Sequence, residues 1–185
     1  MSAVLYTVLV LVVGVERLVE LVVSKRNADW AFARGGVETG RGHFPFMVVL
    51  HTGLLVACVG EVWLADRPFI PALGWSMLAL AVLAQVVRWW CITTLGPRWN
   101  TRVIVVPGLP LVTAGPYRWL SHPNYVVVVV EGIALPMVHT AWLTALVFTV
   151  VNAGLLTVRL REETRALRDA SGAGAGAGVG APVVP

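Results

Sequence analysis

Five apolar stretches constrain the fold of this chain more than any other feature of its sequence. Four of them approach the roughly 20 residues that a transmembrane helix needs, at 3–23, 45–64, 72–92 and 141–158, and a shorter one lies at 124–138. Hydrophobic residues make up 57% of the chain and the mean hydropathy is +0.78, outside the soluble globular range. The sequence therefore predicts an all-α integral membrane protein with about five transmembrane helices.

The basic residues predict how these helices are oriented, because cytoplasmic connections of membrane proteins are enriched in lysine and arginine. With five spans, twelve of the fourteen basic residues fall on one side, Arg67 falls on the other, and Arg17 lies within the first stretch. We expect the N-terminus outside and the C-terminus in the cytoplasm. The compositional bias toward Ala, Val, Gly and Arg points to a bacterium, so the expected location is a bacterial cytoplasmic membrane. The basic residues form no continuous arm, so no nucleic-acid partner is expected.

Three segments are expected along the chain. Residues 1–70 would hold the N-terminal helices and a basic cytoplasmic loop, residues 71–170 a C-terminal core, and residues 171–185 a flexible tail rich in glycine and alanine. Cys58 and Cys91 stand alone in separate apolar stretches, without C-x-x-C spacing or a neighbouring histidine. No metal site is therefore expected.

Ionisable side chains inside the apolar stretches are candidate functional groups, because a buried charge in a membrane is costly. The first stretch contains Glu16, Arg17 and Glu20. For these we prefer a structural explanation, either a local i,i+4 ladder or side chains that reach toward the cytoplasmic interface at the helix end. Glu131 lies deep in the fourth stretch, and helical spacing puts it on one face with Asn124 and Val128. Either a packing hydrogen bond or the wall of a polar cavity would explain that face.

The most polar connection, residues 93–125, contains five prolines and four interleaved Trp and Tyr residues. A connection of this length is usually functional when it is ordered. Ser121 is expected to cap the following helix, with Pro123 in its first turn, so that the helix start would favour an anionic ligand group. The aromatic residues suit an interfacial belt or a cationic ligand equally well.

Near the end of the last stretch, in "VNAGLLTVRLREETRAL", Asn152, Arg159 and Glu163 fall near one helical stripe. The four-residue spacing of Arg159 and Glu163 permits an ion pair. On spacing alone, we expect a solvated pair just beyond the membrane.

Four pieces of sequence together resemble the isoprenylcysteine carboxyl methyltransferase family, especially its short bacterial members: "RWNTRVIVVPG", "LVTAGPYRWLSHPNYV", an apolar hairpin and "RLREETRAL". The resemblance covers roughly residues 75–168 and depends on a G-x-Y-x-x-x-x-H-P-x-Y element followed by R-x-x-x-E. It implies a methyltransferase core that transfers methyl from S-adenosylmethionine to an oxygen of a lipophilic acceptor. The acceptor would enter from the bilayer, and the cofactor pocket would face the cytoplasm.

The resemblance also implies roles for individual residues. The catalytic residues, on the acceptor side, would be Arg159 and Glu163. The cofactor-binding residues would be Gln85, Leu109, Pro110, Leu111, Val112, Tyr117, His122, Pro123, Asn124 and Tyr125. Eukaryotic members carry a histidine where Leu109 stands here, so contact at that position would use the backbone. Glu131 receives no role from the family and is expected to be a cavity-wall acid.

The acidity of the acceptor decides whether a base is needed. A carboxylate, as in a prenylcysteine, is ionised at neutral pH, whereas a phenolic hydroxyl with a pKa of about 10 benefits from a base. His122 or Glu163 could then assist. The short bacterial members favour a lipid-tailed phenol or pyrone, such as an alkylresorcinol.

Two other functions remain open. An NADPH-dependent membrane reductase would share the helical architecture, but the H-P-x-Y and R-x-x-x-E elements favour the methyl donor. A non-catalytic membrane scaffold or carrier would leave the 93–125 connection as an interfacial belt only. The oligomeric state does not follow from the sequence.

Overall fold

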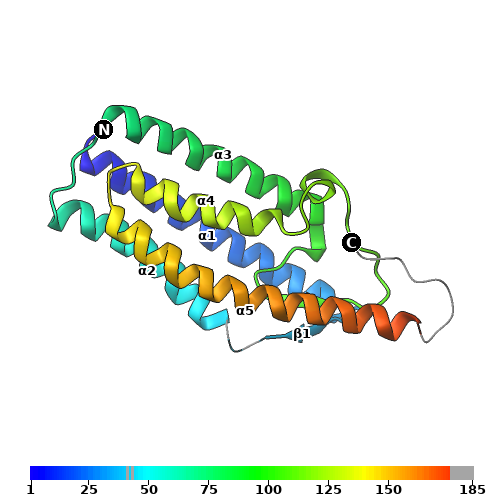
Figure 1. Cartoon of the computed structure of the whole chain (residues 1–185). Helices are drawn as coiled ribbons and strands as arrows, with labels where there is room; N and C mark the ends of the chain where they lie inside the picture. Colours follow the sequence, from blue (N-terminus) through cyan, green and yellow to red (C-terminus); the bar gives the residue numbers. More distant parts are fainter. Residues whose placement is uncertain (41, 43, 176–185) are drawn as a thin grey trace.

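The structure, a computed structural model, describes residues 1–40, 42 and 44–175, with side chains as far as residue 166. Five long helices lie side by side in one bundle (Figure 1). They are α1 (Ala3–Phe32), α2 (Phe44–Leu64), α3 (Pro71–Leu95), α4 (Pro123–Met137) and α5 (Trp142–Ala175). Each corresponds to one of the predicted apolar stretches, although α4 ends one residue before 138 and α5 begins one residue after 141.

Among the described residues, three segments are long and apolar enough to cross a bilayer by length and composition, namely Phe44–Leu64, Pro71–Arg98 and Trp142–Ala166. The helix α4 is apolar but has only 15 residues, and α1 carries charged side chains among its apolar ones. The chain is thus a largely helical membrane protein. The count of five spans and the side on which each terminus lies stay predictions.

The helices alternate in direction along the bundle (Figure 1). The N-terminus and the α2–α3 and α4–α5 connections lie at one end, and the connections that contain residues 33–40 and 96–122 lie at the other. Arg34, Arg98, Arg102 and Arg118 belong to this second pair of connections. The bundle therefore gathers the basic connections at one end, as the charge count predicted.

The polar end of the bundle departs from the all-α prediction. The strand β1 (Val37–Thr39) pairs antiparallel with β2 (Val103–Val105), with Val37 opposite Val105. Short 3-10 helices at Gly96–Arg98 and Gly115–Arg118 also lie in the connection before α4. Each strand has three residues and forms only because the other is near, which explains why neither is visible in the sequence.

The helix α1 holds the start of this connection in place. The side-chain amide of Asn27 donates to the carbonyl oxygens of Gly96 and Trp99, at 3.2 and 2.7 Å. The Ser24 hydroxyl group donates a hydrogen bond to Asn100 Oδ1 at 2.9 Å and accepts one from the backbone N–H of Thr101 at 3.1 Å. These contacts close the bundle interior at its polar end.

The helix α4 begins one residue later than predicted. Its N-cap position is His122, whose side chain makes no capping hydrogen bond, and Pro123 occupies the first helical turn. The Ser121 cap is therefore wrong. Proline has a fixed φ and lacks an amide hydrogen, so it fits the first helical position and leaves the preceding residue outside the helix.

The residues 171–175, predicted as the start of a flexible tail, continue α5, and the rest of the predicted tail lies outside the described residues.

The helices α4 and α5 approach closely where Gly132 faces Phe148. A Cβ atom on Gly132 would lie 2.2 Å from Cε1 of the Phe148 ring, well inside van der Waals contact. At Gly154, on α5, an added Cβ meets no heavy atom within 4 Å. The missing side chain of Gly132 thus lets the hairpin close.

We expect Gly132→Ala to lower the stability of the bundle by about 1–3 kcal/mol, because the Phe148 ring must move out of its packed position. Gly154→Ala should leave stability unchanged or raise it slightly, because alanine favours a helix. Thermal unfolding of both variants in detergent measures the difference. Equal effects of the two substitutions would contradict this account of the hairpin.

Candidate functional site

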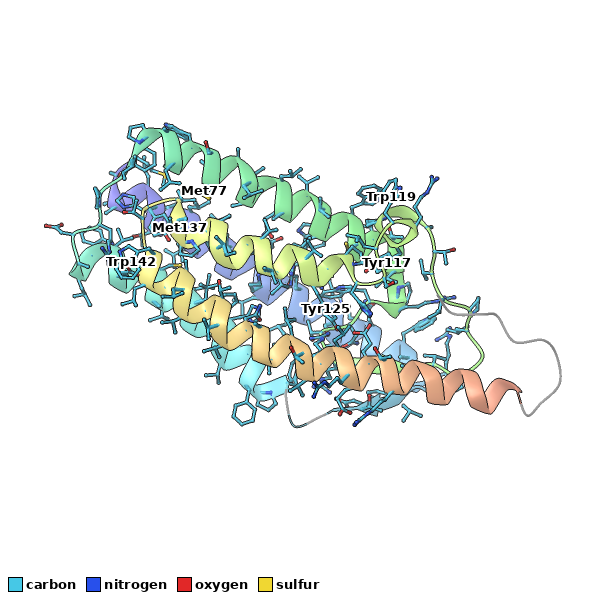
Figure 2. The ribbon with its side chains drawn as sticks, viewed as in Figure 1. Met77, Tyr117, Trp119, Tyr125, Met137 and Trp142 are labelled. Carbon is cyan, nitrogen blue, oxygen red and sulfur yellow. The ribbon has the colours of Figure 1, made fainter. Side chains whose placement is uncertain are left out.

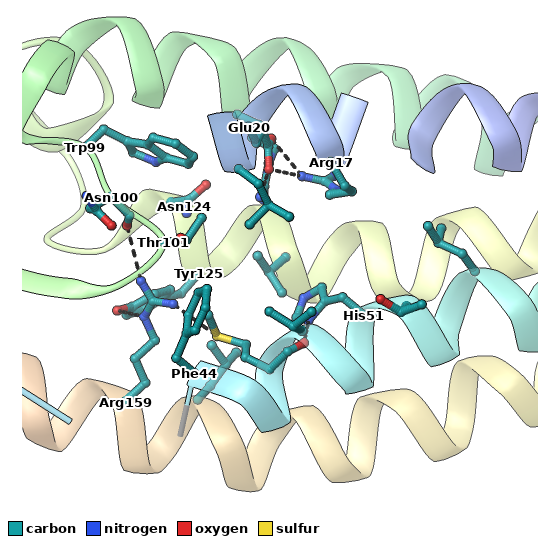
Figure 3. A pocket seen from close by; sticks show the side chains of 18 residues that line it. Arg17, Glu20, Phe44, His51, Trp99, Asn100, Thr101, Asn124, Tyr125 and Arg159 are labelled. Carbon is teal, nitrogen blue, oxygen red and sulfur yellow. Dashed lines mark hydrogen bonds and ion pairs between the residues drawn. The ribbon is translucent and has the colours of Figure 1, made fainter. Parts of the chain in front are cut away.

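A cavity of about 130 Å³ lies inside the bundle, close to its polar end (Figure 3). Side chains from α1, α2, α4 and α5, from the end of α3 and from residues 99–101 surround it. Leu55, Val128 and Leu156 give part of its wall an apolar character. Apolar walls with a few polar groups are the usual form of a small-molecule site.

Tyr125 connects three other residues at one wall of this cavity. Its hydroxyl group donates to the Glu163 carboxylate and receives a hydrogen bond from Arg159 Nε at 2.9 Å. Its ring stacks on His122, with centroids 5.3 Å apart and planes 8° from parallel. His122 Nδ1 in turn lies 3.6 Å from Glu163 Oε1. The fold therefore joins the start of α4 to the second half of α5.

This arrangement overturns the solvated Arg159–Glu163 pair. The two residues form no direct ion pair, because the Tyr125 hydroxyl lies between them. Arg159 is 8% exposed, and its other guanidinium contacts are Met47 Sδ at 3.0 Å and the Asn100 carbonyl oxygen at 3.5 Å. Within the part of the chain that the structure describes, Arg159 is a buried cation with neutral partners only.

A second charged cluster links α1, α3 and α4. Arg17 donates to Glu20 at 2.8 Å, to Gln85 at 3.2 Å and to the Glu131 carboxylate. Arg88 donates to Glu20, with Nη2 and Oε2 2.6 Å apart. Glu20 is only 2% exposed. The local Arg17–Glu20 contact along the helix is present, as a ladder would have it, but the prediction that these side chains reach the interface is wrong. They point into the bundle, where a buried charge requires an opposite charge.

Glu16, the remaining acid of the predicted ladder, also contacts another helix. Trp89 Nε1 on α3 donates to its carboxylate at 2.5 Å. Glu131 lines a small pocket beside the main cavity, and Arg17 and His51 line both spaces. Both explanations for Glu131 therefore apply, because it pairs with Arg17 in the packed bundle and also lines a cavity wall.

Two of the proposed cofactor-binding residues, Asn124 and Tyr125, line the cavity. Asn124 Oδ1 is buried and has no hydrogen-bond partner among the described residues. An unsatisfied buried acceptor is costly, so this oxygen is a candidate contact for a ligand N–H or O–H group. His122 and Pro123 directly precede these residues, and His122 reaches the site through its stacking on Tyr125.

The other proposed cofactor residues lie apart from the cavity. Gln85 belongs to the Arg17 cluster. The connection before Gly115 contains Leu109, Pro110, Leu111 and Val112. The Leu111 side chain is 63% exposed, and the Pro110 carbonyl oxygen accepts a hydrogen bond from Arg98 at 2.6 Å. Neither these four nor Gln85 line the cavity.

Figure 2 shows Tyr117 and Trp119 at the same end of the bundle as Tyr125, and Trp142 at the opposite end. Burial raises the pKa of the Tyr117 hydroxyl, so this group stays protonated and can donate a hydrogen bond. Trp99 is buried against the cavity, whereas Trp119 is exposed and contacts Trp90. The aromatic residues of the connection thus divide between the interior and the surface.

Several lining residues come from helices to which the sequence assigned no site. Met47, His51 and Thr52 belong to α2, and Leu21 belongs to α1. A histidine inside the apolar stretch 45–64 was a usable signal for His51, because ionisable residues in membrane helices are functional candidates. The remaining contacts depend on how the helices face one another.

We expect Glu131→Gln to lower stability by about 3–5 kcal/mol, because Arg17 would lose one of its two buried carboxylate partners. Glu16→Gln is the matched control, since glutamine can still accept the hydrogen bond of Trp89. Thermal unfolding in detergent tests both. If Glu131→Gln unfolds at the temperature of the wild type, the cluster does not stabilise the bundle.

The sequence model of the isoprenylcysteine carboxyl methyltransferase (ICMT) family matches residues 77–169. The uncharacterized protein YpbQ of Bacillus subtilis is 36% identical over 168 residues, which cover 90% of this chain and 99% of that protein. An uncharacterized protein of Haemophilus influenzae is 24% identical over 154 residues, or 82% of this chain and 88% of that protein. No solved structure matches the chain.

Proposed function

Because the chain belongs to the isoprenylcysteine carboxyl methyltransferase family, we propose that it transfers a methyl group from S-adenosylmethionine to an oxygen of a lipophilic acceptor. The observation that carries this proposal is the junction of Arg159, Tyr125 and Glu163, of which Arg159 and Tyr125 line an interior cavity. Family membership indicates a membrane methyltransferase. The donor, the oxygen acceptor and the residue roles are our inference.

The residues at the start of α4 fit the methyl donor. S-adenosylmethionine supplies a methyl group bound to a sulfonium centre next to an amino-acid carboxylate. The stacked rings of His122 and Tyr125, with Glu163 beside them, suit a cation. The beginning of the helix and His122 suit a carboxylate. The unpartnered Asn124 Oδ1 suits a donor group of the ligand.

The acceptor would occupy the cavity with its reacting oxygen near Arg159. A buried guanidinium without a carboxylate partner favours a group that carries or develops negative charge. The apolar wall and the surrounding bilayer suit a lipid tail. Holding donor and acceptor in line and excluding water accounts for up to roughly 7–11 kcal/mol of a barrier.

Two acceptor classes are consistent with this site. A prenylcysteine-like carboxylate would be ionised on arrival, and an alkylresorcinol or alkylpyrone hydroxyl would have to lose a proton. We favour the hydroxyl class, as the sequence resemblance to short bacterial members does. An NADPH-dependent reductase and a non-catalytic carrier are the alternatives, and both predict no affinity for the methyl-donor product.

Calorimetry of the purified protein in detergent distinguishes these functions. We expect micromolar binding of S-adenosylhomocysteine and none of NADPH. His122→Ala should weaken the binding of S-adenosylhomocysteine about tenfold or more, because a stacked ring and a polar partner of Glu163 are lost. His139→Ala, in the connection at the opposite end of the bundle, is the control. Binding of neither ligand would refute the methyltransferase proposal.

Arg159→Gln should reduce methyl transfer about 100-fold or more while leaving the affinity for S-adenosylhomocysteine within a few fold of the wild type, because the buried charge acts on the acceptor. The neighbouring Arg161 is exposed, so Arg161→Gln provides a matched control. Transfer of radiolabelled methyl to an alkylresorcinol measures the effect. Full activity of Arg159→Gln would contradict the assigned role.

A further inference from the structure

His51 lines the cavity, and a hydrogen bond holds its imidazole ring in one orientation. Its Nδ1 lies 2.8 Å from the Met47 carbonyl oxygen, one turn earlier on α2. A carbonyl oxygen only accepts hydrogen bonds, so Nδ1 carries the hydrogen, and Nε2 of the neutral ring keeps a free lone pair. The ring packs edge-on against Phe148, with centroids 5.3 Å apart. Nε2 has no hydrogen-bond partner among the described residues.

Met47 contacts both His51 and Arg159. The Met47 carbonyl oxygen fixes the His51 ring, while Met47 Sδ contacts Arg159 Nη1 at 3.0 Å. His51 and Arg159 both line the cavity (Figure 3). A cation and a free imidazole lone pair thus lie on either side of one methionine.

Charged side chains surround the imidazole from every neighbouring helix. They are Arg17 and Glu20 of α1, Arg88 of α3, Glu131 of α4 and Arg159 of α5. Glu131, which lines the small pocket together with His51, supplies a negative charge next to a protonated ring. Glu131 thus offsets part of the positive charge of Arg17 and Arg88, which by themselves would oppose a proton on His51.

We propose that His51 is the general base for the acceptor hydroxyl, an inference that rests on the proposed methyltransferase function. The acceptor O–H bond breaks and its proton passes to Nε2. The oxygen forms a bond with the methyl carbon as the carbon–sulfur bond of the donor breaks, with its electron pair left on sulfur. The sulfonium thereby becomes a neutral thioether, and the imidazolium returns its proton to solvent after the product leaves.

The residues that the sequence offered for this task are otherwise engaged. The Glu163 carboxylate accepts a hydrogen bond from the Tyr125 hydroxyl group and lies next to the His122 ring. Neither Glu163 nor His122 lines the cavity. His51 lies in α2, outside the residues 77–169 that match the family. Its role would therefore distinguish this chain from enzymes that methylate a carboxylate, which need no base.

Two variants separate the base from its structural role. In His51→Asn, the side-chain amide can still donate to the Met47 carbonyl, but no basic nitrogen remains. His51→Gln provides a second replacement in case the first does not fold, and His139→Asn, at the opposite end of the bundle, is the control. Each variant is first tested for thermal unfolding and for calorimetric binding of S-adenosylhomocysteine, which should both stay close to the wild type.

Methyl transfer is then measured to an alkylresorcinol and to a more acidic fluorinated alkylresorcinol. We expect His51→Asn to lower the rate about 100-fold or more with the first acceptor, and less with the second, because a more acidic hydroxyl needs less help from a base. An alkylated nitrophenol bound with S-adenosylhomocysteine gives a readout without turnover. Its phenolate absorbance should be lower in His51→Asn than in the wild type at the same pH.

The outcomes are separable. If the wild-type protein does not bind S-adenosylhomocysteine, the proposed function itself is refuted. Retained binding with undiminished alkylresorcinol methylation by His51→Asn and His51→Gln would refute the base alone. If His51→Asn loses the same fraction of the rate with both acceptors, or leaves the phenolate absorbance unchanged, His51 only contributes to packing. Methylation of a prenylcysteine but of neither phenol by the wild type would also overturn the inference.

Discussion

The pairing of buried charges governs how this bundle is assembled. An arginine or carboxylate in a low-dielectric interior requires an opposite charge, and here Arg17 and Arg88 meet Glu20 and Glu131 across three helices. Removing one partner would leave another charge buried alone. The cluster therefore fixes how α1, α3 and α4 face one another, and its Arg17, Glu20 and Arg88 side chains line the cavity at which the proposed chemistry takes place.

Arg159, in contrast, makes no direct contact with an opposite charge within the described part of the chain. Its hydrogen bonds go to the Tyr125 hydroxyl, the Met47 sulfur and a carbonyl oxygen, all of them neutral. Inserting Tyr125 between Arg159 and Glu163 keeps the guanidinium from being neutralised directly while the carboxylate stays close. A structural ion pair would be closed to a ligand. The separated pair leaves positive charge available at the cavity, which is what an acceptor oxygen needs.

The sequence predicted the positions of the helices well, but it did not predict which residues of different helices contact one another. Hydropathy located all five helices, and the H-P-x-Y and R-x-x-x-E elements pointed to residues that meet around Tyr125. It did not predict that Glu16, Arg17 and Glu20 contact α3 and α4, and it was wrong about the solvated Arg159–Glu163 pair. Both errors have one cause: spacing along a helix shows which side chains share a face, but not which residue of another helix lies opposite that face.

By itself, the sequence determined that this chain is a helical membrane protein, where its helices lie, and which family it belongs to, because apolar length and local motifs are properties of contiguous residues. Only the tertiary structure decided that α1 and α2 help to build the cavity, that Tyr125 separates two charges, and that His51 presents a free nitrogen there. These features depend on contacts between residues up to 114 positions apart, which no local pattern records.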